Sequence, residues 1–247
     1  MNKKFKQLNA FTLAEVLITL GIIGVVAAVT MPTLIQNYKK HVVETRLAKF
    51  YTTMNQAIQM SETVNGDKKD WDTLGSGFET DEEGNPDYTK STAMAWFDKY
   101  LKPYLKYARV ESFNLLNSTG QVHLYFNDGS VLLFSASGWS FFPDAKKLKI
   151  IIDENGLKNF SRDNSGTDYF SFSFLPNNST TVGKYHYNKG IEPFLVTWDG
   201  SLDGQNGLKT SQRYGCKEEL PPNGRAYCTA LIMLNGWKIP KDYPLKF

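Results

Sequence analysis

The chain has 247 residues, a length that suits one domain with an appendage and is too short for two large domains joined by linkers. Hydrophobic residues make up 41% of the sequence and charged residues 21%, so the chain can bury a core, and disordered, collagen-like and low-complexity classes are excluded. The net charge is +3, but Lys3, Lys4 and Lys6 lie among the first ten residues, and the remainder carries 25 basic and 25 acidic residues. A near-neutral body lacks the basic excess of nucleic-acid-binding proteins, so we do not expect a nucleic acid as a partner.

An apolar segment follows this basic start. It runs from Phe11 to Met31, contains one charged residue, Glu15, and is followed by Pro32. A helix of this length spans the roughly 30 Å hydrocarbon core of a bilayer. A cleaved secretory signal has a shorter apolar core without an acid, and a helix buried in a soluble protein is apolar along one stripe only. We therefore predict one membrane span, and the preceding lysines predict a cytoplasmic N-terminus with the rest of the chain across the membrane.

Glu15 is the unusual residue of this segment, because a carboxylate inside a membrane helix is energetically costly and is usually paired. One interpretation is that Glu15 lies near the headgroups and interacts favourably with the positive end of the helix dipole. The other is that it has a cationic partner. A cut of the chain just before Phe11 would create such a cation, the free α-ammonium group of Phe11.

The residues around that position resemble a known processing motif. The sequence Leu-Asn-Ala-Phe-Thr-Leu-Ala-Glu-Val-Leu, residues 8–17, is similar to the cleavage and methylation motif of type IV prepilins and type II secretion pseudopilins. The resemblance includes a short basic leader, Phe11 as first mature residue, Glu15 four residues later, and Pro32 after the apolar run. It implies that a membrane-embedded prepilin peptidase removes residues 1–10, cutting between Ala10 and Phe11, and N-methylates Phe11. Ala10 stands where the family typically has glycine.

The resemblance also gives Glu15 a role in assembly. In a filament of this family, the apolar helices of many subunits pack together, and the Glu15 carboxylate can pair with the Phe11 ammonium group of a neighbouring copy. An unpaired charge in that low-dielectric core would be strongly unfavourable, so the pair would select one axial offset between subunits. Pairing within one subunit is the alternative, because Phe11 and Glu15 lie one helical turn apart. We favour the intermolecular pair.

The helix is predicted to continue beyond the apolar segment. After Pro32 the hydrophobic residues recur at spacings of three and four up to Ile58, with charged residues between them, and Asn65 and Gly66 form a stop signal. The sequence thus predicts one helix over residues 11–64, with residues 11–31 as the membrane and assembly segment. A coiled coil is the alternative for the amphipathic part, but the pattern is too short for sustained heptads.

Residues 65–247 are predicted to form an α+β head. Residues 67–90 are rich in Gly and acidic residues and indicate a surface excursion, and a short helix is predicted over 92–105. The runs around Asn127-Asp128-Gly129 predict a β-hairpin over 121–134. Further strands are predicted over 149–153, 169–175 and 194–198. An antiparallel sheet packed on the outer half of the long helix follows, and the pilin resemblance implies the same fold.

Cys216 and Cys228 are the two cysteines of the chain. Because the head is predicted to face an oxidising compartment, a disulfide is favoured over a metal site, and two free buried thiols are the alternative. Many type IV pilins carry a C-terminal loop bounded by a disulfide, and this pair is similar in position.

Oxygen-bearing side chains gather around glycine in residues 153–168. Asp153, Asn155, Asp163 and Asp168 could supply the ligands of a calcium site, similar to the acidic loop that some pseudopilins use. The spacing does not match an EF-hand. Turn formation by Asp and Asn between two strands is the favoured interpretation.

The sequence contains none of the common catalytic or nucleotide-binding motifs, and its three histidines are scattered. We therefore expect no enzymatic activity and no bound cofactor other than the calcium of that hypothesis. The expected function is that of a structural subunit of a type IV pilus or type II secretion pseudopilus, in the bacterial inner membrane before assembly and in a filament afterwards. Its expected partners are homologous subunits, the prepilin peptidase and the inner-membrane assembly platform. The alternatives are a monomeric membrane-anchored adhesin or carbohydrate-binding domain, and an anchored hydrolase, for which no catalytic constellation is found.

Overall fold

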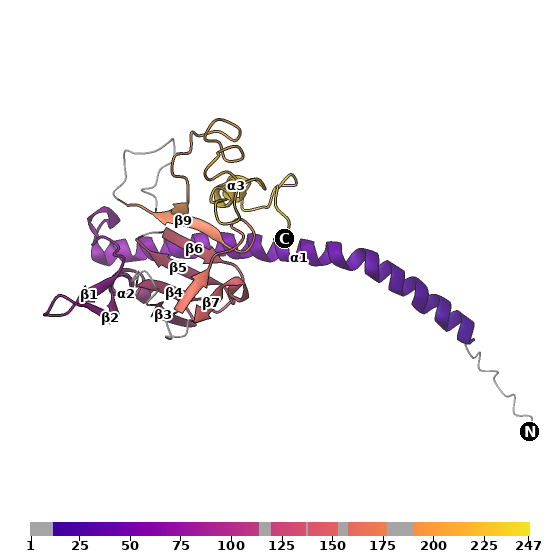
Figure 1. The fold of residues 1–247 in the computed structure, drawn as a ribbon, viewed down its shortest axis with the longest axis horizontal. Helices are drawn as coiled ribbons and strands as arrows, with labels where there is room; N and C mark the ends of the chain where they lie inside the picture. Colours follow the sequence, from indigo (N-terminus) through magenta and orange to yellow (C-terminus); the bar gives the residue numbers. More distant parts are fainter. Residues whose placement is uncertain (1–11, 114–119, 137, 153–157, 177–189) are drawn as a thin grey trace, which may run out of the picture. The chain divides into compact units, whose positions relative to one another are not determined.

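The computed structural model describes residues 12–113, 120–136, 138–152, 158–176 and 190–247 (Figure 1). The chain divides into two units, Met1–His41 and Val42–Phe247, and each is described by itself. The first unit contains the beginning of a long helix. The second unit, which we call the head, contains the end of that helix together with all the described strands. The predicted α+β class is confirmed.

The described helices and strands have the following bounds. The α-helices are α1 (Leu13–Asn65), α2 (Thr92–Tyr100) and α3 (Cys228–Leu234). The strands are β1 (Phe78–Thr80), β2 (Pro86–Ser91), β3 (Arg109–Phe113), β4 (Gln121–Tyr125), β5 (Val131–Ser135), β6 (Gly138–Phe142), β7 (Lys149–Ile152), β8 (Lys158–Ser161), β9 (Phe170–Phe174) and β10 (Ile191–Pro193).

A six-stranded antiparallel sheet forms the centre of the head, with the strand order β10-β9-β6-β5-β4-β3. The pairs β1-β2 and β7-β8 form two separate antiparallel hairpins. The predicted hairpin over 121–134 is confirmed as β4 and β5, which are paired in register from Val122 opposite Phe134 to Tyr125 opposite Val131. Gly129 in their turn has φ +81°, a conformation that glycine adopts without a steric penalty.

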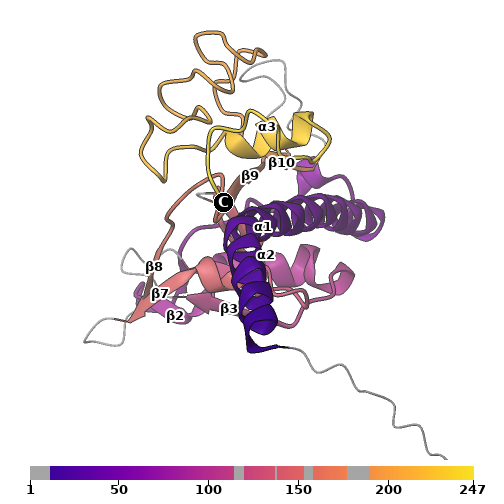
Figure 2. The same ribbon diagram turned by 90° about the vertical axis from the view of Figure 1, so that its right-hand side faces the viewer.

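The second half of α1 packs on this sheet. Its buried residues Val43, Leu47, Phe50, Met54 and Ile58 follow the three- and four-residue spacing of one helix face. The ring of Phe50 stacks on Phe141 of β6 at 4.1 Å between centroids and meets Phe172 of β9 edge-on at 4.9 Å. Figures 1 and 2 show this part of α1 running along the sheet. The predicted packing of the amphipathic half on an antiparallel sheet is therefore confirmed.

Polar contacts fix the rotation of α1 where it enters the head. Glu44 accepts hydrogen bonds at 2.9 Å from the ammonium group of Lys238 and from the backbone N–H of Ile239. One turn later, Lys49 forms an ion pair with Asp128 at 2.8 Å. Burial of Asp128 works against its charged form, but Lys49 and the hydrogen bonds from Ser130 outweigh it and hold the pKa of this carboxyl below its usual value.

The side-chain amide of Asn55 in α1 continues the hydrogen bonding of the sheet at its edge strand β10. It donates to the carbonyl oxygen of Ile191 at 3.1 Å and accepts from the N–H of the same residue at 3.0 Å. Gly190 leaves the space for this approach, because a Cβ there would lie 2.1 Å from the Asn55 oxygen. The helix therefore satisfies an edge that would otherwise be open to pairing with another strand.

Replacing Asn55 by Leu is expected to lower the free energy of unfolding of the head by about 1–3 kcal/mol, because both backbone groups of Ile191 lose their partner. Chemical denaturation followed by near-UV circular dichroism measures the effect. Gln56→Leu is the matched control, since Gln56 is exposed on the same helix. Equal effects of the two substitutions would contradict the role given to Asn55.

Two smaller clusters accompany the core between α1 and the sheet, and the first covers the opposite face of the sheet. Phe142 stacks on Tyr169 in a cluster with Val131, Leu133 and Leu148, against which the β7-β8 hairpin packs through Phe160. A second cluster joins α3 to the segment that follows β10, with Leu195 and Tyr227 fully buried. Figure 2 shows α3 beside β9 and β10.

Several predicted boundaries are wrong. The strand predicted over 194–198 lies instead at β10, Ile191–Pro193, because Trp198 sits in a tight turn after Thr197, whose φ is +66°. The helix predicted over 92–105 ends at Tyr100, and a 3-10 turn over Lys102–Tyr104 follows it, as expected where Pro103 removes a backbone donor. The surface excursion over 67–90 contains the β1-β2 hairpin and the buried Trp71.

Candidate functional site

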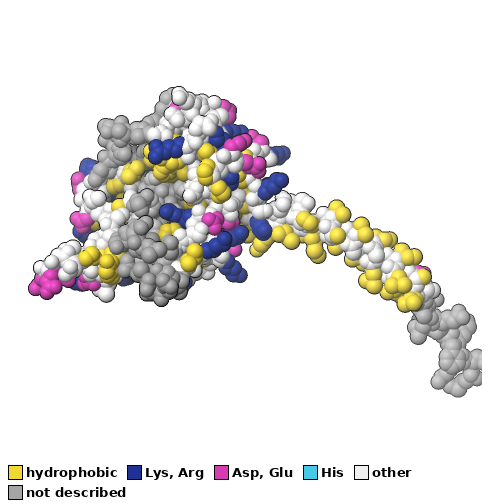
Figure 3. All heavy atoms as spheres, viewed as in Figure 1, with side chains coloured by type: hydrophobic (Ala, Val, Ile, Leu, Met, Phe, Trp, Pro, Cys, Tyr) yellow, Lys and Arg dark blue, Asp and Glu magenta, His cyan; other side chains and the backbone are white. Residues whose placement is uncertain are grey.

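The apolar N-terminal half of α1 is the first candidate site. Helix α1 begins at Leu13 and continues through Pro32, so the long helix predicted from residue 11 is confirmed in its described part. Its large hydrophobic side chains before Tyr38 are 42% to 78% exposed, and Figure 3 shows them as a continuous hydrophobic surface. By length and composition, this is the one helix among the described residues that is able to cross a membrane. Such a surface requires either lipid or other protein as its surroundings.

Glu15 forms a capping box with Thr12, the residue just before the first residue of this helix. Its Oε2 accepts hydrogen bonds from the backbone N–H of Thr12 at 2.8 Å and from the Thr12 hydroxyl at 2.9 Å. The Thr12 oxygen in turn accepts from the backbone N–H of Glu15 at 3.2 Å. This reciprocal arrangement satisfies two backbone donors that a helix N-terminus leaves open. Within the described part of the chain, Oε1 of Glu15 has no hydrogen-bond partner.

Thr12 is a partner of Glu15 that sequence reasoning missed. The signal was present, because Thr followed three residues later by Glu is the sequence pattern of a capping box. The other two hydroxyls of the apolar segment bond to their own helix: Thr19 donates to the carbonyls of Glu15 and Val16, and Thr30 donates to Val26. These bonds remove the cost of placing free hydroxyl groups in hydrocarbon. Ala10 and Phe11 lie outside the described residues, so the cut between them and the pairing of Phe11 stay predictions.

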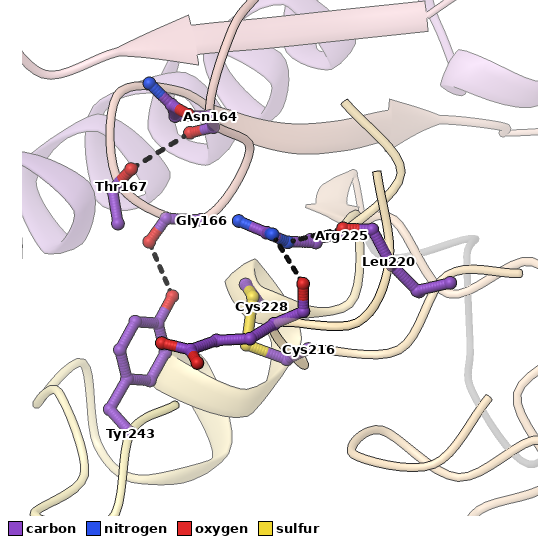
Figure 4. The surroundings of a disulfide bond; sticks show 9 residues. Asn164, Gly166, Thr167, Cys216, Leu220, Arg225, Cys228 and Tyr243 are labelled. Carbon is purple, nitrogen blue, oxygen red and sulfur yellow. Dashed lines mark hydrogen bonds between the residues drawn. A yellow bond between two sulfur atoms is a disulfide. The ribbon is translucent and has the colours of Figure 1, made fainter. Parts of the chain in front are cut away.

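The disulfide predicted between Cys216 and Cys228 is present (Figure 4). It closes the segment 216–228 onto the first residue of α3, and both cysteines are buried. Within the segment, the Arg225 guanidinium donates to the carbonyl oxygens of Leu220 at 3.1 Å and Glu218 at 2.8 Å. The loop is thus held by its own hydrogen bonds as well as by the covalent bridge.

Two tyrosines, the buried Tyr227 and the half-buried Tyr243, pack with the disulfide in one cluster. Tyr243 donates to the carbonyl oxygen of Gly166 at 2.6 Å, as Figure 4 shows, and burial raises the pKa of its phenol well above the usual range. The phenol of Tyr227 donates to the carbonyl oxygen of Val196, and burial raises its pKa as well. Gly166 lies so close to the disulfide that an added Cβ would be 2.6 Å from the sulfur of Cys228. The bridge is therefore packed as part of a core.

Removing the bridge by the double substitution Cys216→Ala and Cys228→Ala is expected to lower the free energy of unfolding by about 3 kcal/mol, since the unfolded chain regains the freedom of a loop of a dozen residues. Chemical denaturation measures the effect, and the matched comparison is the wild-type protein unfolded with and without a reducing agent. Reduced wild type should unfold at the same denaturant concentration as the double variant. A reduced wild type as stable as the oxidised one would contradict this prediction.

The calcium hypothesis rests on residues that the structure describes only in part. Asp153 and Asn155 lie outside the described residues. Asp163 pairs with Lys149 at 3.2 Å, and Asp168 pairs with Lys147 at 3.1 Å. The hydroxyl of Ser161 and the ammonium group of Lys149 hold the pKa of Asp163 below its usual value.

No group of three or more metal-binding His, Cys, Asp or Glu side chains occurs among the described residues. Because Asp163 and Asp168 each pair with a lysine, calcium would also have to displace two ammonium groups. The hypothesis stays a prediction without further support.

Comparison with known proteins places the chain in one family. The model of a family of unknown function, DUF6613, matches residues 33–247. The chain belongs to this family. The match covers the amphipathic part of α1 and the head, and it begins directly after Pro32. No curated protein and no solved structure matches the chain.

Proposed function

We propose that the protein is a structural subunit of a type IV pilus or a type II secretion pseudopilus, which polymerises through the N-terminal half of α1. The carrying observation is the exposed apolar surface of the helix, which contains the single acid Glu15 near its start. In a simple membrane anchor, the acid would serve only to cap its own helix through Thr12. A subunit that transfers the same helix from lipid into a protein bundle needs both the apolar surface and the acid.

The capping box gives Glu15 a partner in the single subunit. While the helix is in the membrane, Thr12 donates two hydrogen bonds to Oε2 of the carboxylate and reduces the cost of desolvating it. Oε1 stays available for a second donor. In the proposed filament that donor is the α-ammonium group of Phe11 of another copy, created when the leader is removed between Ala10 and Phe11. The capping box and the intermolecular pair therefore use different oxygens of one side chain.

Within the head, the second half of α1 is held firmly against the sheet. Glu44 and Lys49 fix the rotation of α1 at the entrance of the head, and Phe50 fixes its depth. The proposal includes an orientation with the N-terminus in the cytoplasm and the head across the inner membrane, where an oxidising compartment accounts for the disulfide.

Photo-crosslinking in the protein's own cells tests polymerisation. A photoreactive amino acid at Val25, which is 67% exposed in the apolar segment, should give a ladder of covalently linked copies in the sheared filament fraction. The same group at the buried Leu105 of the head is the matched control and should give no ladder. The ladder should disappear in a strain that lacks prepilin peptidase activity. A protein that is crosslinked only to lipid at Val25, with no second copy, would refute polymerisation.

A further inference from the structure

The head contains a cavity of about 590 Å³ that the filament role does not use. It lies where three distant parts of the chain meet: residues 71–74, the ends of β6 and β9, and the disulfide-bounded segment, which contributes Ala226. Its volume lies within the range of roughly 300–1,000 Å³ that is typical of small-molecule sites.

The walls of the cavity are apolar and aromatic. Trp71, Trp96 and Trp139 line one part, and Phe194 and Val196 line another. The indole N–H of Trp71 donates to the carbonyl oxygen of Gly66, and that of Trp96 donates to Asp72, both at 2.9 Å. Because these two donors are already engaged, the rings offer carbon surface to a ligand.

A row of serine hydroxyls adds polar groups to the cavity. Along β9, phenylalanines that face the α1 core alternate with Ser171 and Ser173, which lie on the opposite face of the sheet. Ser140 of β6 is paired directly with Ser171. Ser173 is only 8% exposed as a residue and lines the cavity, and the structure shows no hydrogen bond from its hydroxyl to another described residue. This hydroxyl is therefore open to a ligand in the cavity.

Arg162 supplies the positive charge of the cavity. Its Nη1 donates to the hydroxyl of Ser140 at 3.2 Å, and its guanidinium carbon lies 5.2 Å from the ring centre of Phe160. The structure gives this guanidinium no ion pair among the described residues. Asp72 is the acidic residue among the described lining, and it pairs with Lys99 at 2.6 Å. Arg162 is exposed to solvent, and it is the one cationic residue among the described lining of the cavity.

The wall behind Val196 is held in a strained conformation. Thr197, the next residue, has φ +66°, which is costly for a β-branched side chain. The buried phenol of Tyr227, one residue from Ala226, hydrogen-bonds to the Val196 carbonyl oxygen and lies 3.3 Å from the Thr197 hydroxyl. Strain of this kind persists only where the surrounding structure imposes it, and it is concentrated at functional sites.

We propose that this cavity binds a small organic carboxylate with an apolar or aromatic body, such as the C-terminal residue of a peptide. The carboxylate accepts hydrogen bonds from the guanidinium of Arg162 and from the hydroxyls of Ser171 and Ser173. The apolar body lies against Phe194 and Val196. This proposal is independent of polymerisation, because every residue involved belongs to the head.

Isothermal titration calorimetry of the full chain in lipid nanodiscs tests the proposal with two matched probes. N-acetyl-L-phenylalanine carries the carboxylate, and N-acetyl-L-phenylalaninamide has the same body without the charge. The acid is expected to bind about tenfold or more tightly than the amide, because a charge-assisted pair with Arg162 forms only with the acid. Equal binding of both probes, or no binding of the acid at millimolar concentration, would overturn the proposal.

Variants locate the site. Arg162→Gln should remove the preference for the acid, and Ser173→Ala should weaken binding of the acid several-fold. Arg109→Gln is the matched control. Arg109 of β3 lies over the ring of Tyr125 of β4 and does not line the cavity. Near-UV circular dichroism should be unchanged in all three variants. Acid binding that survives Arg162→Gln, or that is lost equally in Arg109→Gln, would contradict the assignment.

Discussion

Glu15→Ala is expected to leave a stable membrane protein that does not enter filaments, with incorporation reduced by about a hundredfold or more if the carboxylate pairs with the Phe11 ammonium group of another copy. The apolar surface is unchanged, so insertion into the membrane is retained or improved. In the bundle, however, the substitution leaves an uncompensated ammonium group in a low-dielectric environment, which is a severe penalty. Immunoblots of the membrane fraction and of the sheared filament fraction measure the two pools separately.

Two further substitutions separate the charge of Glu15 from its capping role. Glu15→Gln removes the charge and keeps an oxygen that can accept from Thr12, whereas Thr12→Ala removes the cap and keeps the charge. If pairing controls assembly, Glu15→Gln fails and Thr12→Ala assembles, provided that mass spectrometry confirms normal processing of both. The reverse outcome would show that Glu15 acts only on its own helix.

The second large effect is expected for Phe50→Ala, which should lower the free energy of unfolding of the head by about 3–5 kcal/mol. Phe50 is 4% exposed, stacks on Phe141 and contacts Phe172, so its removal leaves a cavity between α1 and two central strands. The surrounding rings are held by the sheet and cannot close that cavity. Denaturation in nanodiscs, followed by the near-UV signal of the tryptophans, measures the loss.

Val64→Ala on the same helix is the matched control for Phe50→Ala. Val64 is 73% exposed, and its truncation should change stability by no more than about 0.5 kcal/mol. If both substitutions cost the same, α1 does not form the core of the head in the way described.

The features that could be predicted from the sequence are those that depend on local pattern. The spacing of apolar residues predicts α1 correctly because burial of one helix face depends on neighbours three and four residues away. The Asn127–Gly129 turn predicts the β4-β5 hairpin for a similar reason, since turn geometry depends on a few adjacent residues. The disulfide follows from there being only two cysteines in the chain.

The features that could not be predicted depend on contacts between distant residues. The pattern of residues 194–198 predicts a strand that the structure places at Ile191–Pro193, where β9 and Asn55, both distant in sequence, supply the hydrogen bonds. The cavity combines Trp71, Arg162 and Ala226, and no local pattern connects them. The Thr12 partner of Glu15 is different, because its capping pattern is local and overlaps with the residues of the processing motif.

Mass spectrometry of the N-terminus of the protein isolated from its own cells tests the central claim most directly. The account predicts a mature chain that begins at Phe11 and carries one additional methyl group on the α-amino nitrogen. That chain would contain both members of the charge pair, the Phe11 ammonium group and the Glu15 carboxylate. A chain that still begins at Met1 would lack the cation on which assembly depends, and would contradict the account.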